Sequence, residues 1–118
     1  MHVDEKNLCV LFPAARKGLN PDEITIAEVL KEQDYATMCI GKWHLGDHPD
    51  FMPTSHGFDH YFGIPYSNDM NRKQVPLPLV RDLTVIEDSV QKDTTITAQY
   101  TTEAVKFIKA NSKNPFFL

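Results

Sequence analysis

Lys42 and His44 are the residues whose types and spacing most clearly suggest chemistry. They flank Trp43 and follow an uncharged run at residues 35–40. If the chain stays extended there, both side chains leave the same face and Trp43 points into packing, because side chains alternate along a strand. A lysine supplies a fixed positive charge, and a histidine can move a proton near neutral pH. The pair therefore suits an anionic group rich in oxygen atoms.

Two elements must position this pair. Residues 35–40 carry aromatic, threonine and isoleucine side chains, which predict a buried strand. Residues 22–33 predict an amphipathic helix before it, because Asn20 can cap a helix, Pro21 suits its first position and Glu23 completes a pattern like a capping box. A helix closely followed by a strand is half of a βαβ unit, and ligands often bind at the carboxyl ends of strands in such sheets.

Residues 47–70 mix glycine, proline, aromatic and polar residues, which predicts a long ordered loop with a short strand near residues 60–63. Four of the five histidines fall within residues 44–60. Two pairs have the i, i+4 spacing that binds a metal ion from a helix: His44 with His48, and His56 with His60. A histidine metal site is therefore an alternative, although the glycines and proline between these residues argue against the helix it needs.

The second half of the chain predicts structural elements and no residues with an evident chemical role. Residues 75–80 predict an edge or extended segment, because prolines exclude a central strand. Residues 83–87 and 88–90 predict a small hairpin, and residues 94–110 predict a second helix. The apolar residues 115–118 predict the opening of a further buried strand. We therefore expect a fragment of a larger domain.

The composition limits the possible partners. With 118 residues and 42% apolar content, the chain is one small domain or a piece of a larger one. Its net charge of −4 argues against nucleic acid as the main partner, and no stretch approaches the ~20 apolar residues of a membrane span. The polar N-terminus does not predict a signal peptide. Cys9 and Cys39 lie in apolar contexts without metal or redox spacing, so they predict buried thiols.

Three motifs together carry a resemblance to a known family. They are Gly-Lys-Trp-His-Leu-Gly at residues 41–46, Gly-Phe-Asp at 57–59 and Pro-Tyr-Ser-Asn-Asp at 65–69. This combination resembles the sulfatase family, and the arylsulfatase-type enzymes in particular. The resemblance is strongest over residues 18–70 and extends more loosely to the end of the chain, so residues 1–118 are interpreted as part of a sulfatase catalytic domain.

The resemblance implies an α/β fold, part of an alkaline-phosphatase-like α/β/α sandwich with a mixed sheet, truncated at both ends. It implies a sulfuric ester hydrolase that acts on a sulfate ester small molecule or a sulfated sugar. Its nucleophile would be a formylglycine made from the Cys of a Cys-x-Pro/Ala-x-Arg motif, beside a calcium ion. By the same match, Lys42 and His44 would be catalytic and substrate-binding, and Ser67 would be substrate-binding. Such sites need cationic, preorganised donors where the transition state carries charge.

The sequence also departs from the family pattern. No Cys-x-Pro/Ala-x-Arg motif occurs, and Cys9 lacks the small third residue and the arginine that would make it the nucleophile. The paired aspartates expected near the family's N-terminus are absent too. We therefore expect the chain to supply the Lys/His wall of a sulfate pocket without the formylglycine precursor or calcium ligands, and to be inactive alone.

Three other functions remain open at this point. The chain could be a non-catalytic module that binds anions or sulfated sugars, and sulfate binding that depends on Lys42 would mark it. It could belong to a phosphate-ester branch of the alkaline phosphatase superfamily, or it could be a small histidine metal-binding protein. Sulfatases are often secreted, periplasmic or lysosomal, and this sequence does not decide between those compartments.

Overall fold

The computed structural model describes residues 10–70, 76–90 and 94–118. In these ranges the chain forms a five-stranded mixed sheet in the order β4-β3-β2-β1-β5. The strands are β1 Ala36–Lys42, β2 His60–Ile64, β3 Leu79–Arg81, β4 Thr84–Glu87 and β5 Phe116–Phe117. The helices are α1 Ile26–Lys31 and α2 Ile96–Ala110, with short 3-10 helices η1 Pro49–Phe51, η2 Pro53–Ser55 and η3 Asn68–Met70. The α/β class with a mixed sheet is confirmed.

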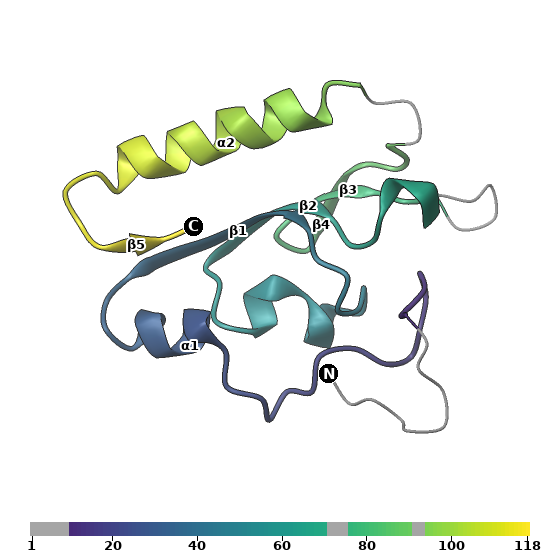
Figure 1. Cartoon of the computed structure of the whole chain (residues 1–118), viewed down its shortest axis with the longest axis horizontal. Helices are drawn as coiled ribbons and strands as arrows, with labels where there is room; N and C mark the ends of the chain where they lie inside the picture. Colours follow the sequence, from purple (N-terminus) through teal and green to yellow (C-terminus); the bar gives the residue numbers. More distant parts are fainter. Residues whose placement is uncertain (1–9, 71–75, 91–93) are drawn as a thin grey trace.

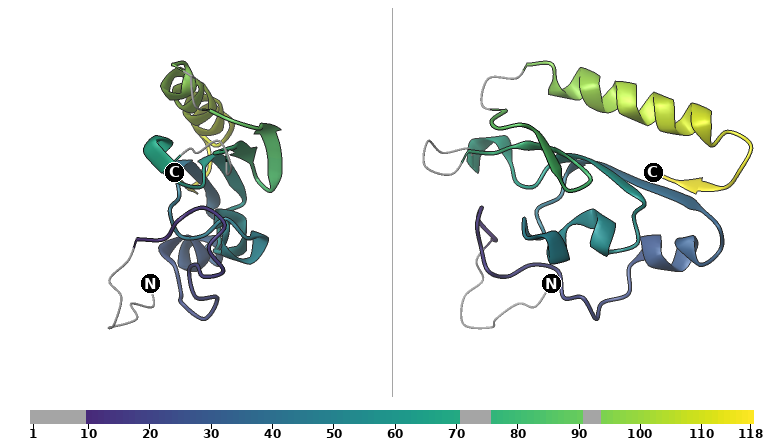
Figure 2. Two further views of the ribbon diagram at one scale, coloured as in Figure 1. Left: turned by 90° about the vertical axis from the view of Figure 1, so that its right-hand side faces the viewer. Right: turned by 180° about the vertical axis from the view of Figure 1, so that it is seen from behind.

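The sheet separates two layers of helix (Figure 1). The long helix α2 runs along one face, while α1, η1 and η2 lie on the other. The turned views of Figure 2 show the same separation. Both α1 and α2 contact β1, so this strand lies between the two layers, as a strand inside an α/β sheet should.

β1 is the structural centre of the chain. It pairs in parallel with β2 from Met38↔His60 to Lys42↔Ile64, and in parallel with β5 on its other side. The predicted strand at residues 35–40 is confirmed and continues through Gly41 and Lys42. The short strand near residues 60–63 and the strand at the apolar C-terminal end are confirmed as well.

Two apolar clusters cover the faces of the sheet. The larger one packs Ile96 and Phe107 of α2 against Met38, Phe62 and Leu79 of the strands. The smaller one, on the opposite face, is built from Met52, Tyr61 and Val80, with Cys39 and Trp43 against it. Within the described residues, no helix combines the length and the apolar character that a membrane crossing requires.

The first helix is shorter than the predicted span of residues 22–33. It starts at Ile26 because Thr25, not Asn20, is its N-cap. The Thr25 hydroxyl accepts from the Glu28 N–H at 3.1 Å, and the Glu28 carboxylate accepts from the Thr25 N–H at 2.6 Å. This reciprocal pair satisfies two backbone donors at once and fixes the start of the helix. The predicted cap at Asn20 is wrong.

The predicted apolar face of α1 is also wrong in part. Only Ala27 is buried, whereas Ile26 is 69% exposed and Val29 is 50% exposed. One short turn of helix over the sheet buries little more than the small residue that faces it. Further apolar side chains are exposed at Ile24 and on α2 at Ile108.

The predicted hairpin forms with a different partner. β4 pairs with β3 in antiparallel fashion, with Arg81 opposite Thr84, and not with residues 88–90. β3 is therefore an interior strand, with β2 on its other side, and β4 lies at the edge of the described sheet, so the predicted edge or extended segment is wrong for residues 79–80. The prolines at 76 and 78 precede β3, so they remove no donor from its ladders. Residue 75 of the predicted edge segment lies outside the described residues.

A hydrogen-bonded cluster fixes the start of β1 against the loop before β2. Thr37 is fully buried, and its N–H donates to the Asp59 carboxylate at 3.0 Å. The Asp59 N–H donates back to the Thr37 hydroxyl at 2.9 Å, and that hydroxyl donates to the Gly57 carbonyl at 2.7 Å. Lys31 of α1 pairs with Asp59 at 2.7 Å. The cluster thus joins helix, strand and loop.

We predict an acid-sensitive contribution to stability from Asp59. Desolvation raises the pKa of this carboxyl group, but the hydrogen bonds from Lys31 and Thr37 outweigh it and hold the pKa below its ordinary value. A lowered pKa stabilises the folded chain above pH ~4, and that stabilisation is lost as the pH falls through the lowered pKa. Asp59→Asn should lower the free energy of unfolding by about 1 kcal/mol at pH 7, the upper end for a partly exposed ion pair.

Urea denaturation at pH 7 and at pH 3 measures this contribution. The difference between wild type and Asp59→Asn should shrink at pH 3, while exposed Asp88→Asn should show no such difference at either pH. An equal deficit of the Asp59→Asn variant at both pH values would contradict the assignment.

Candidate functional site

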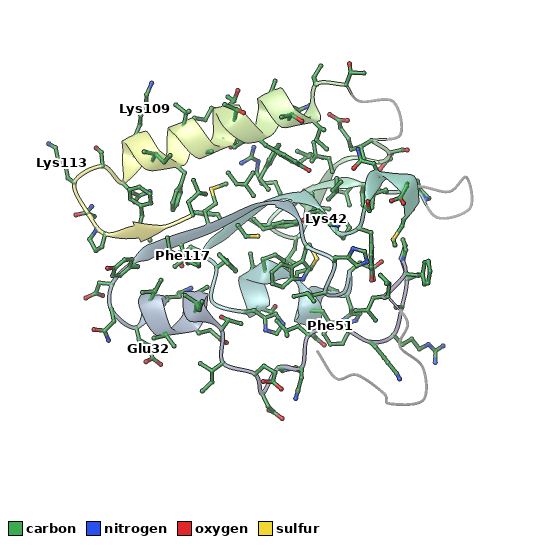
Figure 3. All side chains as sticks on the ribbon, in the orientation of Figure 1. Glu32, Lys42, Phe51, Lys109, Lys113 and Phe117 are labelled. Atoms are coloured by element: carbon green, nitrogen blue, oxygen red, sulfur yellow. The ribbon has the colours of Figure 1, made fainter. Side chains whose placement is uncertain are left out.

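The exits of β1 and β2 remain joined after the strands end. The Trp43 N–H donates to the Ile64 carbonyl at 3.1 Å, and the His44 N–H donates to the Pro65 carbonyl at 2.8 Å. Because β1 and β2 are parallel, their carboxyl ends meet at one edge of the sheet. Figure 3 shows Lys42 and Phe51 toward the end of the molecule opposite Glu32 and Lys113. Of the sequence-predicted residues, Lys42 is the last residue of β1, and His44 and Ser67 follow the ends of β1 and β2.

The expected strand alternation of Lys42 and His44 is wrong. β1 ends at Lys42, and His44 adopts a φ of +66°, which is uncommon for a residue other than glycine. The two side chains are therefore placed by a backbone turn rather than by an extended strand. Such strained backbone persists only where surrounding contacts hold it. Here the hydrogen bond from the His44 N–H to the neighbouring strand exit holds it.

All three predicted residues influence the pKa of the Asp69 carboxyl group. A hydrogen bond with the Ser67 side chain holds the pKa of the Asp69 carboxyl group below its ordinary value, against a smaller opposing effect of desolvation. The Asp69 backbone N–H and the positive charges of Lys42 and His44 lower this pKa further. Sequence reasoning gave Asp69 no role, although it is the last residue of the Pro-Tyr-Ser-Asn-Asp motif.

The imidazole of His44 is held on two sides. Its Nε2 lies 3.1 Å from the Leu11 carbonyl oxygen. Its ring packs edge-on against Tyr66, with ring centroids 5.3 Å apart and planes at 76°. A carbonyl oxygen only accepts hydrogen bonds, so Nε2 must carry the hydrogen in this contact. In the neutral ring Nδ1 is then the nitrogen with a free lone pair.

The Trp43 side chain, between Lys42 and His44, points into packing, as predicted. Its indole N–H donates to the Phe51 carbonyl at 2.7 Å. The ring stacks on His56 at 6.3 Å and packs with the smaller apolar cluster. A tryptophan with its N–H satisfied and its rings packed leaves little freedom to the residues on either side.

The structure does not bring the histidines together as a metal site. His56 is fully buried beneath Trp43, whereas His48 and His60 are exposed beside Asp50 and Asp82, at 3.4 and 3.6 Å. Among the described residues, no group of three or more His, Cys, Asp or Glu side chains could hold a metal ion. The described His, Cys, Asp and Glu residues therefore do not fit the calcium cage that the resemblance implies.

Cys39 is not a candidate nucleophile. It lies within β1, and burial raises the pKa of its thiol to about 11, so the thiolate is scarce at neutral pH. Cys9 lies outside the described residues. The site contains a lysine, a histidine and a serine, which can bind and orient an oxyanion and hold a proton at His44, and an aspartate, whose negative charge opposes anion binding.

Comparison with known proteins identifies the relatives of this chain. It is 36% identical to arylsulfatase G of Mus musculus, over 86% of this chain and 25% of that protein. It is 42% identical to arylsulfatase A of Bos taurus, over 64% of this chain and 19% of that protein. It is 34% identical to N-acetylgalactosamine-6-sulfatase of Canis lupus familiaris, over 86% of this chain and 22% of that protein. The chain thus spans about a quarter or less of the length of these curated relatives.

Solved structures share the fold. The crystal structure of Ps i-CgsB in complex with k-i-k-neocarrahexaose matches with a TM-score of 0.72 and 28% identity, over 91% of this chain and 28% of that one. A further structure, described with glycosaminoglycan metabolism by Bacteroides thetaiotaomicron, matches with a TM-score of 0.76 at 21% identity, over 96% of this chain and 36% of that one. The family model described as Sulfatase matches residues 4–118. The chain, with its Lys42–His44 turn on a mixed α/β sheet, belongs to the sulfatase family.

Proposed function

We propose that residues 1–118 are part of the catalytic domain of an arylsulfatase-type sulfuric ester hydrolase, and that Lys42, His44 and Ser67 form one wall of its sulfate pocket. One observation carries this proposal: the exits of parallel strands β1 and β2 stay joined by the backbone bonds from Trp43 to Ile64 and from His44 to Pro65, so the chain around Lys42 lies beside the segment that leads to Ser67. Ligands of open α/β sheets bind at this edge. Membership of the sulfatase family supports hydrolysis of a sulfuric ester as the reaction. The position at the strand exits supports Lys42, His44 and Ser67 as the residues of the pocket wall.

Each side chain has a part that follows from its chemistry. The Lys42 ammonium group is exposed and supplies a positive charge to the sulfate oxygens. The Ser67 hydroxyl supplies a hydrogen bond donor once it turns from Asp69. Because Nε2 of His44 is bonded to the Leu11 carbonyl, Nδ1 is the atom that accepts a proton from a neighbouring hydroxyl, or donates one when the ring is charged.

Asp69 places a negative charge near these groups. Its carboxylate interacts with the Ser67 side chain and is influenced by Lys42 and His44. A sulfate oxyanion entering this wall competes with Asp69 for the same donors and is repelled by its charge. We therefore expect the Asp69 carboxylate to weaken the binding of sulfate.

The nucleophile and the metal would come from outside this sequence. The sulfatase family generally implies calcium and a formylglycine, which supply the attacking hydroxyl and the positive charge beside it. The sequence contains no Cys-x-Pro/Ala-x-Arg motif, and the described residues form no metal cage. We therefore propose that the 118 residues bind and orient a sulfate group but do not cleave the ester alone. Relatives named as arylsulfatases and as N-acetylgalactosamine-6-sulfatase support small sulfate esters or sulfated sugars as substrates.

The first prediction concerns Lys42. Lys42→Ala should weaken the binding of inorganic sulfate about tenfold, because a charged hydrogen bond donor is lost. Titration of the chain with sulfate, followed by the amide NMR signals of residues 42–44 and 67–69, measures the affinity. Lys109→Ala removes an exposed charge from α2, at a distance from this edge (Figure 3), and should leave the affinity unchanged. Equal affinities of wild type and Lys42→Ala would contradict the proposed wall.

The second prediction concerns Asp69. Asp69→Asn keeps an acceptor for the Ser67 hydroxyl but removes the competing negative charge. Sulfate should then bind about two- to fivefold more tightly, the range expected for exposed charge pairs. The same NMR titration measures this change, and Asp88→Asn, in the segment after β4, serves as the matched control. Weaker sulfate binding by Asp69→Asn would show that the carboxylate orders the wall rather than competing with the anion.

A further inference from the structure

We propose that Asp47 is a positioning residue for His44: its carboxylate holds the turn that presents the Leu11 carbonyl to the imidazole, and so keeps the hydrogen of the neutral ring on Nε2. This inference rests on the proposed function, in which His44 exchanges a proton at Nδ1. Asp47 directly follows the Gly-Lys-Trp-His-Leu-Gly motif, and none of the three sulfatase motifs includes it.

Two hydrogen bonds tie a short segment before α1 to the chain that follows β1. The Leu11 carbonyl oxygen lies 3.1 Å from Nε2 of His44. Three residues after Leu11, the Ala14 N–H donates to Oδ2 of Asp47 at 2.7 Å. Three residues span only about 10 Å even when fully extended, so the position of Ala14 limits where the Leu11 carbonyl can lie. Asp47 therefore acts on His44 through this segment.

The turn that contains Ala14 needs this support. The Ala15 N–H donates to the Phe12 carbonyl at 3.0 Å, and Ala14 between them has a φ of +64°. This left-handed conformation is unfavourable for alanine, because the Cβ atom approaches the following carbonyl oxygen. The Leu11 side chain packs against the larger apolar cluster, but Phe12 is half-exposed. The bond to Asp47 therefore works together with the packing of Leu11 to hold a turn that the backbone does not favour.

Asp47 also lies near the second group that contacts the imidazole. The ring of buried Tyr66 packs edge-on against His44, with ring centroids 5.3 Å apart. Burial, and then the charge of Asp47, raise the pKa of the Tyr66 phenol to about 12, so this ring stays uncharged at neutral pH. Asp47 and Tyr66 line the same cavity of about 250 Å³. Both contacts of the imidazole are thus close to the Asp47 carboxylate.

The position of the ring hydrogen decides what His44 can do. A neutral imidazole carries one hydrogen, on either nitrogen, and the other nitrogen is an acceptor. The Leu11 carbonyl only accepts, so it favours the form with hydrogen on Nε2 and leaves Nδ1 able to take a proton. When this bond weakens, the form with hydrogen on Nδ1 becomes more populated, and that form cannot accept a proton at Nδ1.

NMR of the ¹⁵N-labelled 118-residue chain at pH 8, where histidine rings are mostly neutral, shows which imidazole nitrogen carries the hydrogen. Asp47→Ala should lower the ratio of the Nε2–H form to the Nδ1–H form of His44 about threefold, because a hydrogen bond of ordinary strength is weakened. Asp47→Asn keeps an oxygen that accepts the Ala14 N–H and should preserve the wild-type ratio. Asp50→Ala removes an exposed carboxylate that pairs with His48 and should leave the His44 ratio unchanged.

The outcomes separate this inference from the proposed function. A wild-type ratio in Asp47→Ala, or a ratio in Asp47→Asn as low as in Asp47→Ala, overturns the positioning role. Loss of the amide signals of the β1–β2 ladder in Asp47→Ala overturns it too, because Asp47 would then support the whole fold rather than His44. The sulfate wall fails separately, if sulfate binding is insensitive to Lys42→Ala while the His44 ratio still responds to Asp47→Ala.

Discussion

The hydrogen bonds between the exits of β1 and β2 are the constraint on which the site depends. Parallel strands usually diverge into separate loops after their last ladder bond. Here Trp43 and His44 continue to donate to the carbonyls of Ile64 and Pro65. The two exits cannot separate without leaving these backbone groups unpaired, which costs free energy wherever water is excluded. These hydrogen bonds therefore keep the segment around Lys42 next to the segment that contains Ser67.

The ladder beneath these exits allows a close backbone approach. At Gly63 a Cβ atom would collide with the Gly41 carbonyl, its direct partner across the ladder. Gly41 has a φ of +116°, a conformation that other residues rarely adopt. The hydroxyl of buried Tyr61 donates to the same Gly41 carbonyl at 3.0 Å. Glycines and a buried tyrosine therefore hold the backbone in place directly before Lys42.

The sequence predicted the parts of this arrangement that depend on local pattern. An uncharged run at residues 35–40 predicts a buried strand, and alternation along that strand predicts that Trp43 points into packing. The motif at residues 65–69 led to Ser67 through family resemblance, and no local rule places that serine beside Lys42. The parallel pairing of β1 with β2 brings the exits together, and pairing between distant segments does not appear in any single stretch of sequence.

The wrong predictions share one physical cause, because local rules ignore what the rest of the chain supplies. Strand alternation failed at His44, whose positive φ is held by its backbone bond to Pro65. Asn20 is a good N-cap, but Thr25 also donates to the His56 carbonyl at 2.9 Å, so tertiary contact reinforces the cap that the helix uses. The strand within residues 83–87 pairs with β3, which is itself paired with β2, and not with residues 88–90. The local pattern did not show that β3 would be available as a partner.

The most direct test of the sulfate wall is to locate an anion on it. Selenate has the shape and charge of sulfate, and selenium gives an anomalous X-ray signal. In a crystal of the chain soaked with selenate, the account predicts an anomalous peak within hydrogen-bond distance of Lys42 Nζ and Ser67 Oγ, with the Ser67 hydroxyl turned from Asp69. Selenate bound elsewhere, with Ser67 still bonded to Asp69, would contradict the account.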